Sequence, residues 1–193
     1  MSGEGRLVVV SNRLPITIES TQAGHRPHPS GGGLVSALVP VLRKTGGCWV
    51  GWTGTDYHVA LPQLLRDWRS GENYSFEPVF LTASERARYY RGFSNEIIWP
   101  LFHSLPSRCQ FDSAYWNDYC AVNEKFAEAV ARVSQRGDFI WVHDYHLMML
   151  AHALRTRGMS GANASPTGRS QCAEHVQQLG SESLLSNLME VKD

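Results

Sequence analysis

The chain has 193 residues, 42% of them hydrophobic and 19% charged, which suits one globular domain with a substantial core. Its 18 basic and 18 acidic residues give a formal net charge of zero, whereas proteins that bind nucleic acids generally show a basic excess. No apolar run approaches the roughly 20 residues needed to span a bilayer, and residues 7–10 are too few for a secretory signal.

Residues 7–10, Leu-Val-Val-Val, predict a strand buried on both faces, because four apolar residues follow one another. Polar residues 11–13 come next, and Pro15 ends the strand. A loop rich in histidine and proline should then lead to the glycines 31–33. Apolar residues recur at helical spacing behind the glycines, and Pro40 should kink or shorten this helix. Its apolar stripe consists of Leu34, Val35, Leu38, Val41 and Leu42.

The middle of the chain predicts further short strands at residues 49–52 and 78–81. Thr82 and Glu85 have the spacing of a capping box, so a helix should start at Ala83. The arginines of this helix should form a solvated face; they are Arg86, Arg88 and Arg91.

A longer helix should follow a cap at Asp112 or Ser113. Its apolar stripe should face the core and consists of Trp116, Tyr119, Phe126, Val130 and Val133. Residues 139–142 predict a second fully buried strand, which ends in the polar residues 143–146. Residues 147–157 predict the helix that follows.

The order of buried strand, polar loop, glycine run and helix is typical of a doubly wound α/β fold with a Rossmann-like parallel sheet. Both buried strands end in polar residues, and ligands of such sheets bind beyond the carboxyl ends of the strands. Arg13, the glycines 31–33 and Asp144 should therefore converge on one crevice.

Each candidate residue has a functional and an ordinary structural interpretation. Arg13 can grip phosphate oxygens with its planar fork, or it can form a surface salt bridge. The glycines can cradle a phosphate at a helix start, or they can be a flexible linker, because the run is neither GxGxxG nor a P-loop. Asp144 can accept hydrogen bonds from sugar hydroxyls, with His143 and His146 orienting their neighbours. The H-D-x-H spacing also admits a metal site, although the sequence holds no second ligand cluster.

The composition changes near residue 158. Residues 158–181 are rich in Gly, Ser, Ala and Gln and hold no aromatic residue, so we expect them to be disordered. The chain thus divides into an α/β domain over residues 1–157 and an atypical tail over residues 158–193.

The cysteines are far apart and form no CxxC pair, which indicates reduced thiols and no disulfide frame or zinc site. They are Cys48, Cys109, Cys120 and Cys172. Cysteine usage, charge and hydropathy together predict a cytoplasmic protein with no nucleic-acid or membrane partner.

Several short motifs follow one another along the chain. They are RLVVVSNRLP from Arg6, GGL from Gly32, WVGW from Trp49, YY from Tyr89, FSN from Phe93, WPLFH from Trp99 and WVHDYHL from Trp141. In this order they closely resemble the N-terminal part of the trehalose-6-phosphate synthases, the retaining GT-B enzymes of glycosyltransferase family 20. The resemblance covers residues 6–157 and rests on the combination of motifs.

The resemblance implies an acceptor site for glucose 6-phosphate. Arg13 matches the arginine that holds the acceptor phosphate, and Tyr90 matches a tyrosine at the same acceptor. Asp144 matches the aspartate that binds acceptor hydroxyls. Either Trp49 or Trp52 would wall this pocket.

The resemblance also implies a donor site and a reaction. Gly32 and Gly33 match a glycine loop that closes on the diphosphate of UDP-glucose, and Trp99 matches a tryptophan associated with anomer selectivity. The family forms α,α-trehalose 6-phosphate by front-face glucosyl transfer with retention, and needs neither metal nor cofactor.

The family's C-terminal Rossmann-like domain, which supplies basic residues for the donor diphosphate, has no counterpart after Arg157. We therefore expect a GT-B N-terminal half that is inactive alone. The alternative is a non-catalytic synthase-like module that binds sugar phosphate or regulates full-length subunits. A homo-oligomer is compatible with either interpretation.

Overall fold

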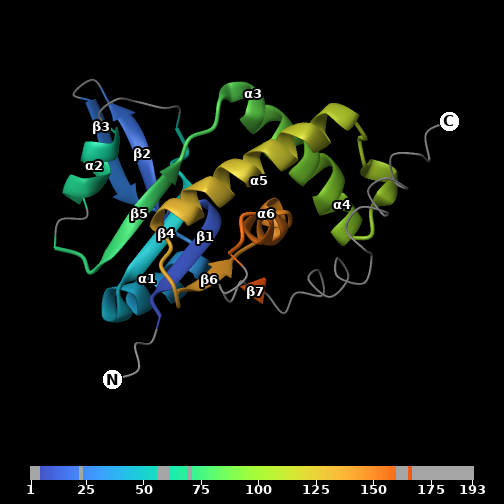
Figure 1. The fold of residues 1–193 in the computed structure, drawn as a ribbon. Helices are drawn as coiled ribbons and strands as arrows, with labels where there is room; N and C mark the ends of the chain where they lie inside the picture. Colours follow the sequence, from blue (N-terminus) through green and yellow to red (C-terminus); the bar gives the residue numbers. More distant parts are fainter. Residues whose placement is uncertain (1–4, 22–23, 56–60, 69–70, 160–164, 167–193) are drawn as a thin grey trace.

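The computed structural model describes residues 5–21, 24–55, 61–68, 71–159 and 165–166. A five-stranded sheet lies at the centre with helices on both faces, and a two-stranded hairpin stands at one end (Figure 1). The strands are β1 (Leu7–Arg13), β2 (Ile16–Thr21), β3 (Gly24–Pro29), β4 (Gly47–Trp52), β5 (Tyr74–Val79), β6 (Phe139–Val142) and β7 (Ser165–Pro166). The α-helices are α1 (Gly33–Thr45), α2 (Leu61–Trp68), α3 (Ala83–Glu85), α4 (Trp99–Phe102), α5 (Ser113–Val133) and α6 (Leu150–Thr156). A π-helix, η1 (Arg86–Ile98), and two 3-10 helices, η2 (Pro106–Arg108) and η3 (Tyr145–Leu147), complete the described elements.

The strand order in the sheet is β5-β4-β1-β6-β7, and every neighbouring pair is parallel. The chain adds β4 and β5 on one side of β1 and then returns to add β6 on the other side. β1 and β6 therefore flank the point where the strand order reverses, which is where open α/β sheets bind ligands. This topology confirms the predicted doubly wound α/β fold.

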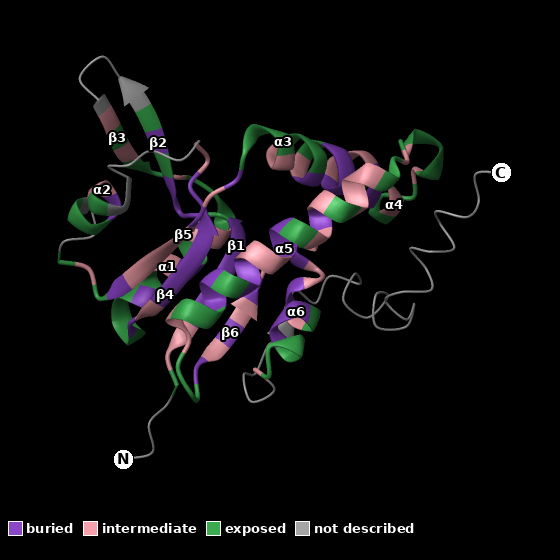
Figure 2. Cartoon of the chain, turned by 45° about the horizontal axis from the view of Figure 1, so that its top comes forward, coloured by how far each residue is buried: buried purple, intermediate pink, exposed green. Residues whose placement is uncertain are grey.

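Consecutive residues of β1 point into two different cores. Val8 and Val10 pack into the core that includes residues of α5 and α6, whereas Val9 packs with Leu38 and Leu42 of α1. All three valines have no exposed surface. Figure 2 shows the buried residues concentrated in the sheet and on the inner side of α5. Burial on both faces explains the unbroken apolar run at the start of the chain.

The segment that the sequence predicted to be a loop forms the antiparallel hairpin β2–β3. Ile16 and Ile18 alternate with polar residues and are buried, which is the period of a strand. Pro27 and Pro29 lie in β3 and obscured this pattern. Both strands of a two-stranded hairpin are edge strands, where proline is tolerated.

Two other predicted elements need correction. β5 begins at Tyr74, earlier than the predicted strand at residues 78–81, and includes Pro78 because it is an edge strand. α1 continues through Pro40, which is exposed, so water can satisfy the carbonyl that the proline leaves unpaired. Val41 of the predicted stripe is 41% exposed, whereas Leu38 and Leu42 are buried and Leu34 and Val35 pack partly buried against the same core.

The second predicted strand is less buried than its apolar run suggests. Ile140 and Val142 of β6 are buried, but Phe139 and Trp141 are partly exposed. The neighbouring strand β7 consists of two residues, which pair with Trp141 and Val142. Phe139 and Trp141 are alternate residues and share one face of the strand, so β6 is less buried on that face than on the face of Ile140 and Val142.

Both predicted helix starts are confirmed. The Oγ1 atom of Thr82 accepts a hydrogen bond from the Glu85 N–H at 3.2 Å, and the Glu85 carboxylate accepts one from the Thr82 N–H at 2.9 Å. Asp112, not Ser113, caps α5 by accepting from the N–H of Ala114 at 2.8 Å. The helix that starts at Ala83 continues as the π-helix η1, a helix type that the sequence did not predict.

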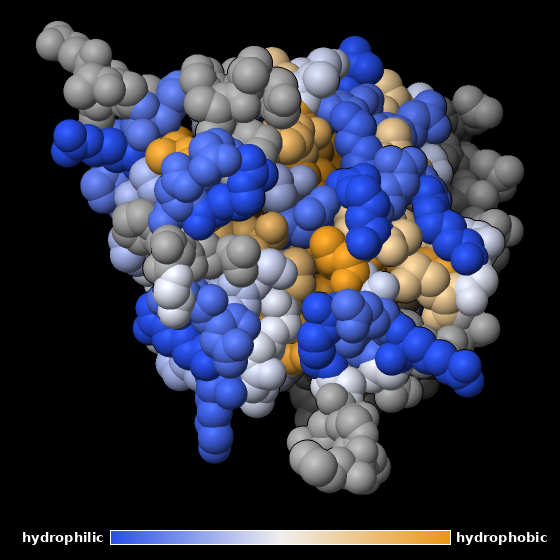
Figure 3. Space-filling view, turned by 60° about the vertical axis from the view of Figure 1, so that its left-hand side comes forward, coloured by the Kyte–Doolittle hydropathy of each residue, from blue (hydrophilic) through white to orange (hydrophobic). Residues whose placement is uncertain are grey.

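The predicted tail lies almost entirely outside the described residues, as does Cys172. Among the described residues Cys109 and Cys120 are free thiols, and Cys48 is buried. Within the described ranges, none of the helices is long and apolar enough to cross a membrane. On the side of the molecule that Figure 3 shows, hydrophilic residues cover most of the coloured surface, with hydrophobic patches between them.

An ion pair joins the starts of β1 and β6. The guanidinium of Arg6 donates to both carboxylate oxygens of Asp138, at 3.2 and 2.8 Å, and the N–H of Gln135 donates at 2.8 Å. Burial raises the pKa of the Asp138 carboxyl, but these donors outweigh it and hold the pKa below its ordinary value of 3.8. The pair fixes the register in which Leu7 faces Phe139.

We expect Asp138→Asn to lower the free energy of unfolding by about 2 kcal/mol near neutral pH, because hydrogen bonds to a charged group are lost. A lowered folded-state pKa means that this stabilisation is complete above about pH 4 and disappears as the pH falls through that pKa. The two proteins should therefore converge in strong acid. Urea unfolding across this pH range measures the effect, with exposed Asp67→Asn as control. An equal loss in both variants near neutral pH would contradict the assignment.

Candidate functional site

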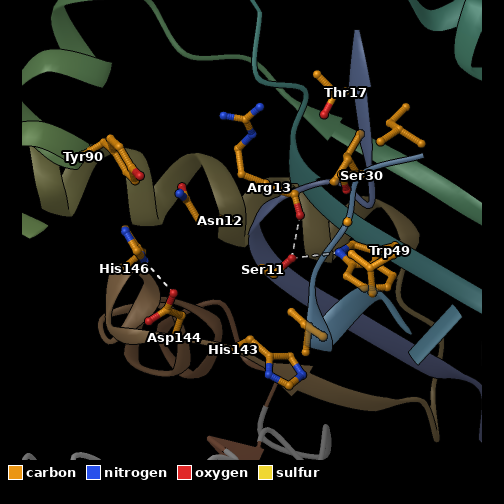
Figure 4. Close-up of a pocket in the computed structure, with 15 residues that line it drawn as sticks. Ser11, Asn12, Arg13, Thr17, Ser30, Trp49, Tyr90, His143, Asp144 and His146 are labelled. Atoms are coloured by element: carbon orange, nitrogen blue, oxygen red, sulfur yellow. Dashed lines mark hydrogen bonds and ion pairs between the residues drawn. The ribbon is translucent and has the colours of Figure 1, made fainter. Parts of the chain in front are cut away.

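A pocket of about 370 Å³ opens where β1 and β6 end (Figure 4). Its residues come from the end of β1, the hairpin, the start of α1, β4, η1 and the loop after β6. They are Ser11, Asn12, Arg13, Leu14, Ile16, Thr17, Ser30, Gly31, Leu34, Val35, Trp49, Tyr90, His143, Asp144 and His146. The pocket thus lies at the point where the strand order reverses.

The structure brings several predicted site residues together. Arg13, Tyr90 and Asp144 line the pocket, and so do Trp49 and Gly31. In the view of Figure 4, Arg13 and Tyr90 lie in the upper part and Asp144 in the lower part. Arg13, Asp144 and one member of the glycine run, Gly31, therefore meet at one pocket, as the sequence predicts.

Other predicted residues lie outside the pocket lining. Gly32 is the N-cap of α1 with φ +134°, and Gly33 begins that helix. Trp52 is buried at the end of β4. Trp99 is 40% exposed at the start of α4, where its ring stacks on His103 with 4.0 Å between centroids.

The guanidinium of Arg13 lies over the ring of Trp52, 4.7 Å from its centroid. Gly54 leaves room for it, because a Cβ at this position would collide with the Nη2 atom of Arg13. Burial lowers the pKa of Arg13 and Tyr90 opposes this shift, but the side chain remains a cation at neutral pH. No carboxylate of the described residues forms an ion pair with Arg13. Its charge can therefore meet an anion in the pocket.

Ser11 and Trp49 hold the end of β1 in place. The Ser11 hydroxyl donates to the carbonyl of Arg13 at 2.7 Å and accepts from the indole N–H of Trp49 at 2.8 Å. The pairing of β1 with β4 shifts register between Val10 and Arg13, and such irregularities re-aim side chains. Trp49 has no exposed surface, so it supports the strand end more than it walls the pocket.

Asp144 adopts a backbone conformation that favours glycine, with φ +78° and ψ 156°. One carboxylate oxygen accepts from the N–H of Tyr145 at 2.8 Å, and the other lies 3.0 Å from Nδ1 of His146. Burial raises the pKa of Asp144, but His146, the Tyr145 N–H and His143 together lower it below its ordinary value. Asp144 is therefore a carboxylate at neutral pH and a hydrogen-bond acceptor for a ligand.

Buried groups on the helices support the pocket from behind. The hydroxyl of Tyr89 donates to the Asn12 side chain at 3.1 Å, next to Arg13. The hydroxyl of Tyr119 donates to the Tyr145 carbonyl at 2.7 Å and accepts from the N–H of Met148 at 3.1 Å. The spacing of the sequence predicts Tyr119 only as part of an apolar stripe, because spacing does not reveal what a buried hydroxyl contacts.

The H-D-x-H segment does not form a metal cluster. Among the residues that the structure describes, no three His, Cys, Asp or Glu side chains are grouped to hold a metal ion. Asp144 and His146 instead contact each other. With a cation and a carboxylate on one pocket, the arrangement suits a ligand that carries both an anionic group and hydroxyls.

Comparison with known sequences gives a consistent result. The sequence model of glycosyltransferase family 20 matches residues 5–162. An α,α-trehalose-phosphate synthase (UDP-forming) of Emericella nidulans is 46% identical over 153 residues, covering 79% of this chain and 30% of the relative. A trehalose-6-phosphate synthase of Mycobacterium is 41% identical over 155 residues, with 80% and 30% coverage. The chain thus spans about 30% of the length of these curated relatives.

Solved structures agree with the sequence comparison. The α,α-trehalose 6-phosphate synthase of Burkholderia multivorans is 36% identical with a TM-score of 0.65, covering 82% of this chain and 32% of that protein. An α,α-trehalose-phosphate synthase of Burkholderia xenovorans, solved in complex with glucose 6-phosphate, is 32% identical with a TM-score of 0.62 and coverages of 81% and 32%. The Escherichia coli protein bound with UDP-2-fluoro glucose is also 32% identical, with a TM-score of 0.62 and coverages of 80% and 31%.

The parallel sheet and the pocket at its switch point are those of the N-terminal, Rossmann-like half of a GT-B glycosyltransferase. The match to more than half of the chain shows the particular family. The chain belongs to glycosyltransferase family 20.

We expect Gly54→Ala to weaken the binding of inorganic phosphate, because the added Cβ displaces the Arg13 guanidinium. Gly71→Ala is a matched control: Gly71 has φ +94° against +84° at Gly54, but a Cβ there meets nothing within 4 Å. Both variants should lose about 1 kcal/mol of stability through backbone strain. Phosphate titrations followed by NMR distinguish the two sites. Equal affinity in both variants would show that the position of Arg13 does not matter for anion binding.

Proposed function

We propose that the pocket is the acceptor site for glucose 6-phosphate in the synthesis of α,α-trehalose 6-phosphate. The observation that carries this proposal is the pairing, on one pocket, of the cation Arg13, which has no ion pair among the described residues, with the carboxylate Asp144. Relatives named trehalose-phosphate synthases support trehalose biosynthesis as the process. The Burkholderia xenovorans structure with glucose 6-phosphate supports the choice of acceptor.

The chemistry of the lining residues suits a sugar phosphate. A phosphate dianion needs a positive partner, and the fork of Arg13 can donate two parallel hydrogen bonds to it. Asp144 accepts hydrogen bonds, so it selects hydroxyls at the other end of the ligand. Tyr90 lines the same pocket and adds a phenolic hydroxyl near the cation.

We assign the donor role to UDP-glucose on the basis of the family. The Escherichia coli relative was solved with UDP-2-fluoro glucose, and the curated relatives are named UDP-forming. Gly32 and Gly33 at the start of α1 would face the donor diphosphate, and Trp99 would act on anomer selectivity. In transfer with retention, the leaving phosphate takes the proton of the acceptor hydroxyl. Hydrogen-bond donors that are already in place must then stabilise the negative charge that develops on the diphosphate.

This chain alone should bind the acceptor without transferring glucose. Its described residues supply Arg13 and Asp144 for an acceptor, whereas the family's basic residues for the donor diphosphate have no match among the motifs found in this sequence. The second candidate function is therefore a non-catalytic module that binds sugar phosphate or associates with full-length subunits.

We expect the purified 193-residue chain to show no glucosyl transfer from UDP-glucose to glucose 6-phosphate. The physical reason is that Arg13 is the only Lys or Arg among the described residues that line the pocket, so no cluster of basic donors there can stabilise the leaving diphosphate. A coupled assay of UDP release measures the reaction. Turnover above a control without protein would overturn this prediction and favour an active enzyme.

We expect the wild-type chain to bind glucose 6-phosphate and Arg13→Ala to weaken this binding by at least roughly 10-fold, the low end of the cost of a single charged hydrogen bond, because the fork donates two. Arg88→Ala is the matched control, because the Arg88 side chain is 51% exposed and pairs with Asp118 at 3.2 Å, outside the pocket. Calorimetry or NMR titration gives both affinities. If the two variants bind as the wild type does, Arg13 is not the phosphate ligand.

A further inference from the structure

His146 is held in a slot between two tyrosine rings. Its ring stacks on Tyr90 with 5.3 Å between centroids and a 13° interplanar angle, and on Tyr145 with 4.3 Å and 23°. The His146 side chain is 7% exposed. A ring packed on two faces keeps its orientation, because close-packed interiors leave no room for rotation. The edges of the imidazole therefore point in fixed directions.

One edge of this ring meets the pocket carboxylate. Nδ1 of His146 lies 3.0 Å from an Asp144 oxygen, and Figure 4 shows this contact at the lower left of the pocket. The second oxygen accepts from the N–H of Tyr145 at 2.8 Å. Each carboxylate oxygen thus has one fixed neighbour, while the Asp144 side chain remains 46% exposed. A carboxylate oxygen has lone pairs to spare, so both can still accept from a ligand.

The backbone around this pair is strained and firmly held. The conformation of Asp144 is unfavourable for a non-glycine residue and persists only where its surroundings enforce it. Here the side chain of Asn123 donates to the His146 carbonyl at 3.2 Å, and Tyr119 donates to the Tyr145 carbonyl at 2.7 Å. Both donors come from α5, which is anchored in the core.

We propose that His146 is a positioning residue, which donates from Nδ1 to Asp144 and turns that carboxylate toward the hydroxyls of the acceptor. The inference rests on the proposed function, because it assumes a sugar phosphate in the pocket. Both ring nitrogens of His146 are buried, so they act on the ligand through Asp144 although the residue lines the pocket. Nδ1 lies 3.0 Å from the Asp144 oxygen, although the contact is not aligned as a hydrogen bond, and Nε2 has no hydrogen-bond partner among the described residues. Nδ1 is therefore the atom that should carry the proton in the neutral ring.

The first experiment tests the pair without any ligand. Long-range ¹H–¹⁵N spectra of the labelled chain distinguish the two neutral tautomers, and the signals of His146 are those that vanish in His146→Asn. The expected result is a proton on Nδ1. A proton on Nε2 alone would overturn the proposal, because His146 could not then donate to Asp144.

The second experiment compares glucose 6-phosphate with inorganic phosphate as ligands of the full chain. His146→Leu should weaken glucose 6-phosphate binding about tenfold, the value of one hydrogen bond, and leave phosphate binding unchanged. His146→Asn should restore most of the affinity, because its amide N–H can replace Nδ1–H. His152→Leu, at an exposed histidine of α6, is the control and should change neither affinity.

The outcomes separate this inference from the proposed function. Equal weakening of both ligands in His146→Leu, or no weakening of either, would overturn the positioning role while leaving the acceptor site intact. Failure of His146→Asn to restore binding would also overturn it. A wild-type chain that binds phosphate with no preference for glucose 6-phosphate would overturn the proposed function, and the positioning role with it.

Discussion

The parallel pairing of β1 with β6 is the contact on which the pocket depends. The strands pair from Leu7 with Phe139 to Val10 with Val142. The ion pair of Arg6 and Asp138 links the two residues that directly precede these strands. Because parallel strands run in the same direction, the polar residues that follow them emerge at the same edge of the sheet. Arg13 and Asp144, which are far apart in sequence, therefore reach one pocket.

The pocket combines features that a chain would not keep for stability alone. It holds a cation with no ion pair among the described residues and a carboxylate on a strained backbone. Buried polar groups hold both in place: Tyr89 through Asn12 on one side, and Tyr119 on the other. Unpaired charge and local strain tend to gather at ligand sites, where surrounding structure must hold them.

Much of the fold and part of the site could be predicted from the sequence. Apolar runs identified the strands at Val8 and Ile140, and the polar residues after them located Arg13 and Asp144 at one edge. The hairpin was missed because Pro27 interrupts its pattern, although it is compatible with an edge strand.

Other features depend on contacts between distant residues, which spacing alone does not encode. The position of the Arg13 guanidinium over the Trp52 ring depends on the register shift of β1 and on the absence of a side chain at Gly54. The π-helical course of η1 and the packing of His146 between tyrosines also arise only once the helices and the strand-end loop meet. Tertiary packing, more than local propensity, determines such features.

The ends of β1 and β6 together form the proposed acceptor site. Amide chemical-shift mapping of the ¹⁵N-labelled chain during a glucose 6-phosphate titration shows whether both ends bind the ligand. Signals of Arg13, Tyr90 and Asp144 should shift together along one binding curve, with those of exposed Arg132 on α5, outside the pocket lining, unaffected. Shifts at the end of only one of the two strands, or shifts confined to residues outside the pocket, would contradict it.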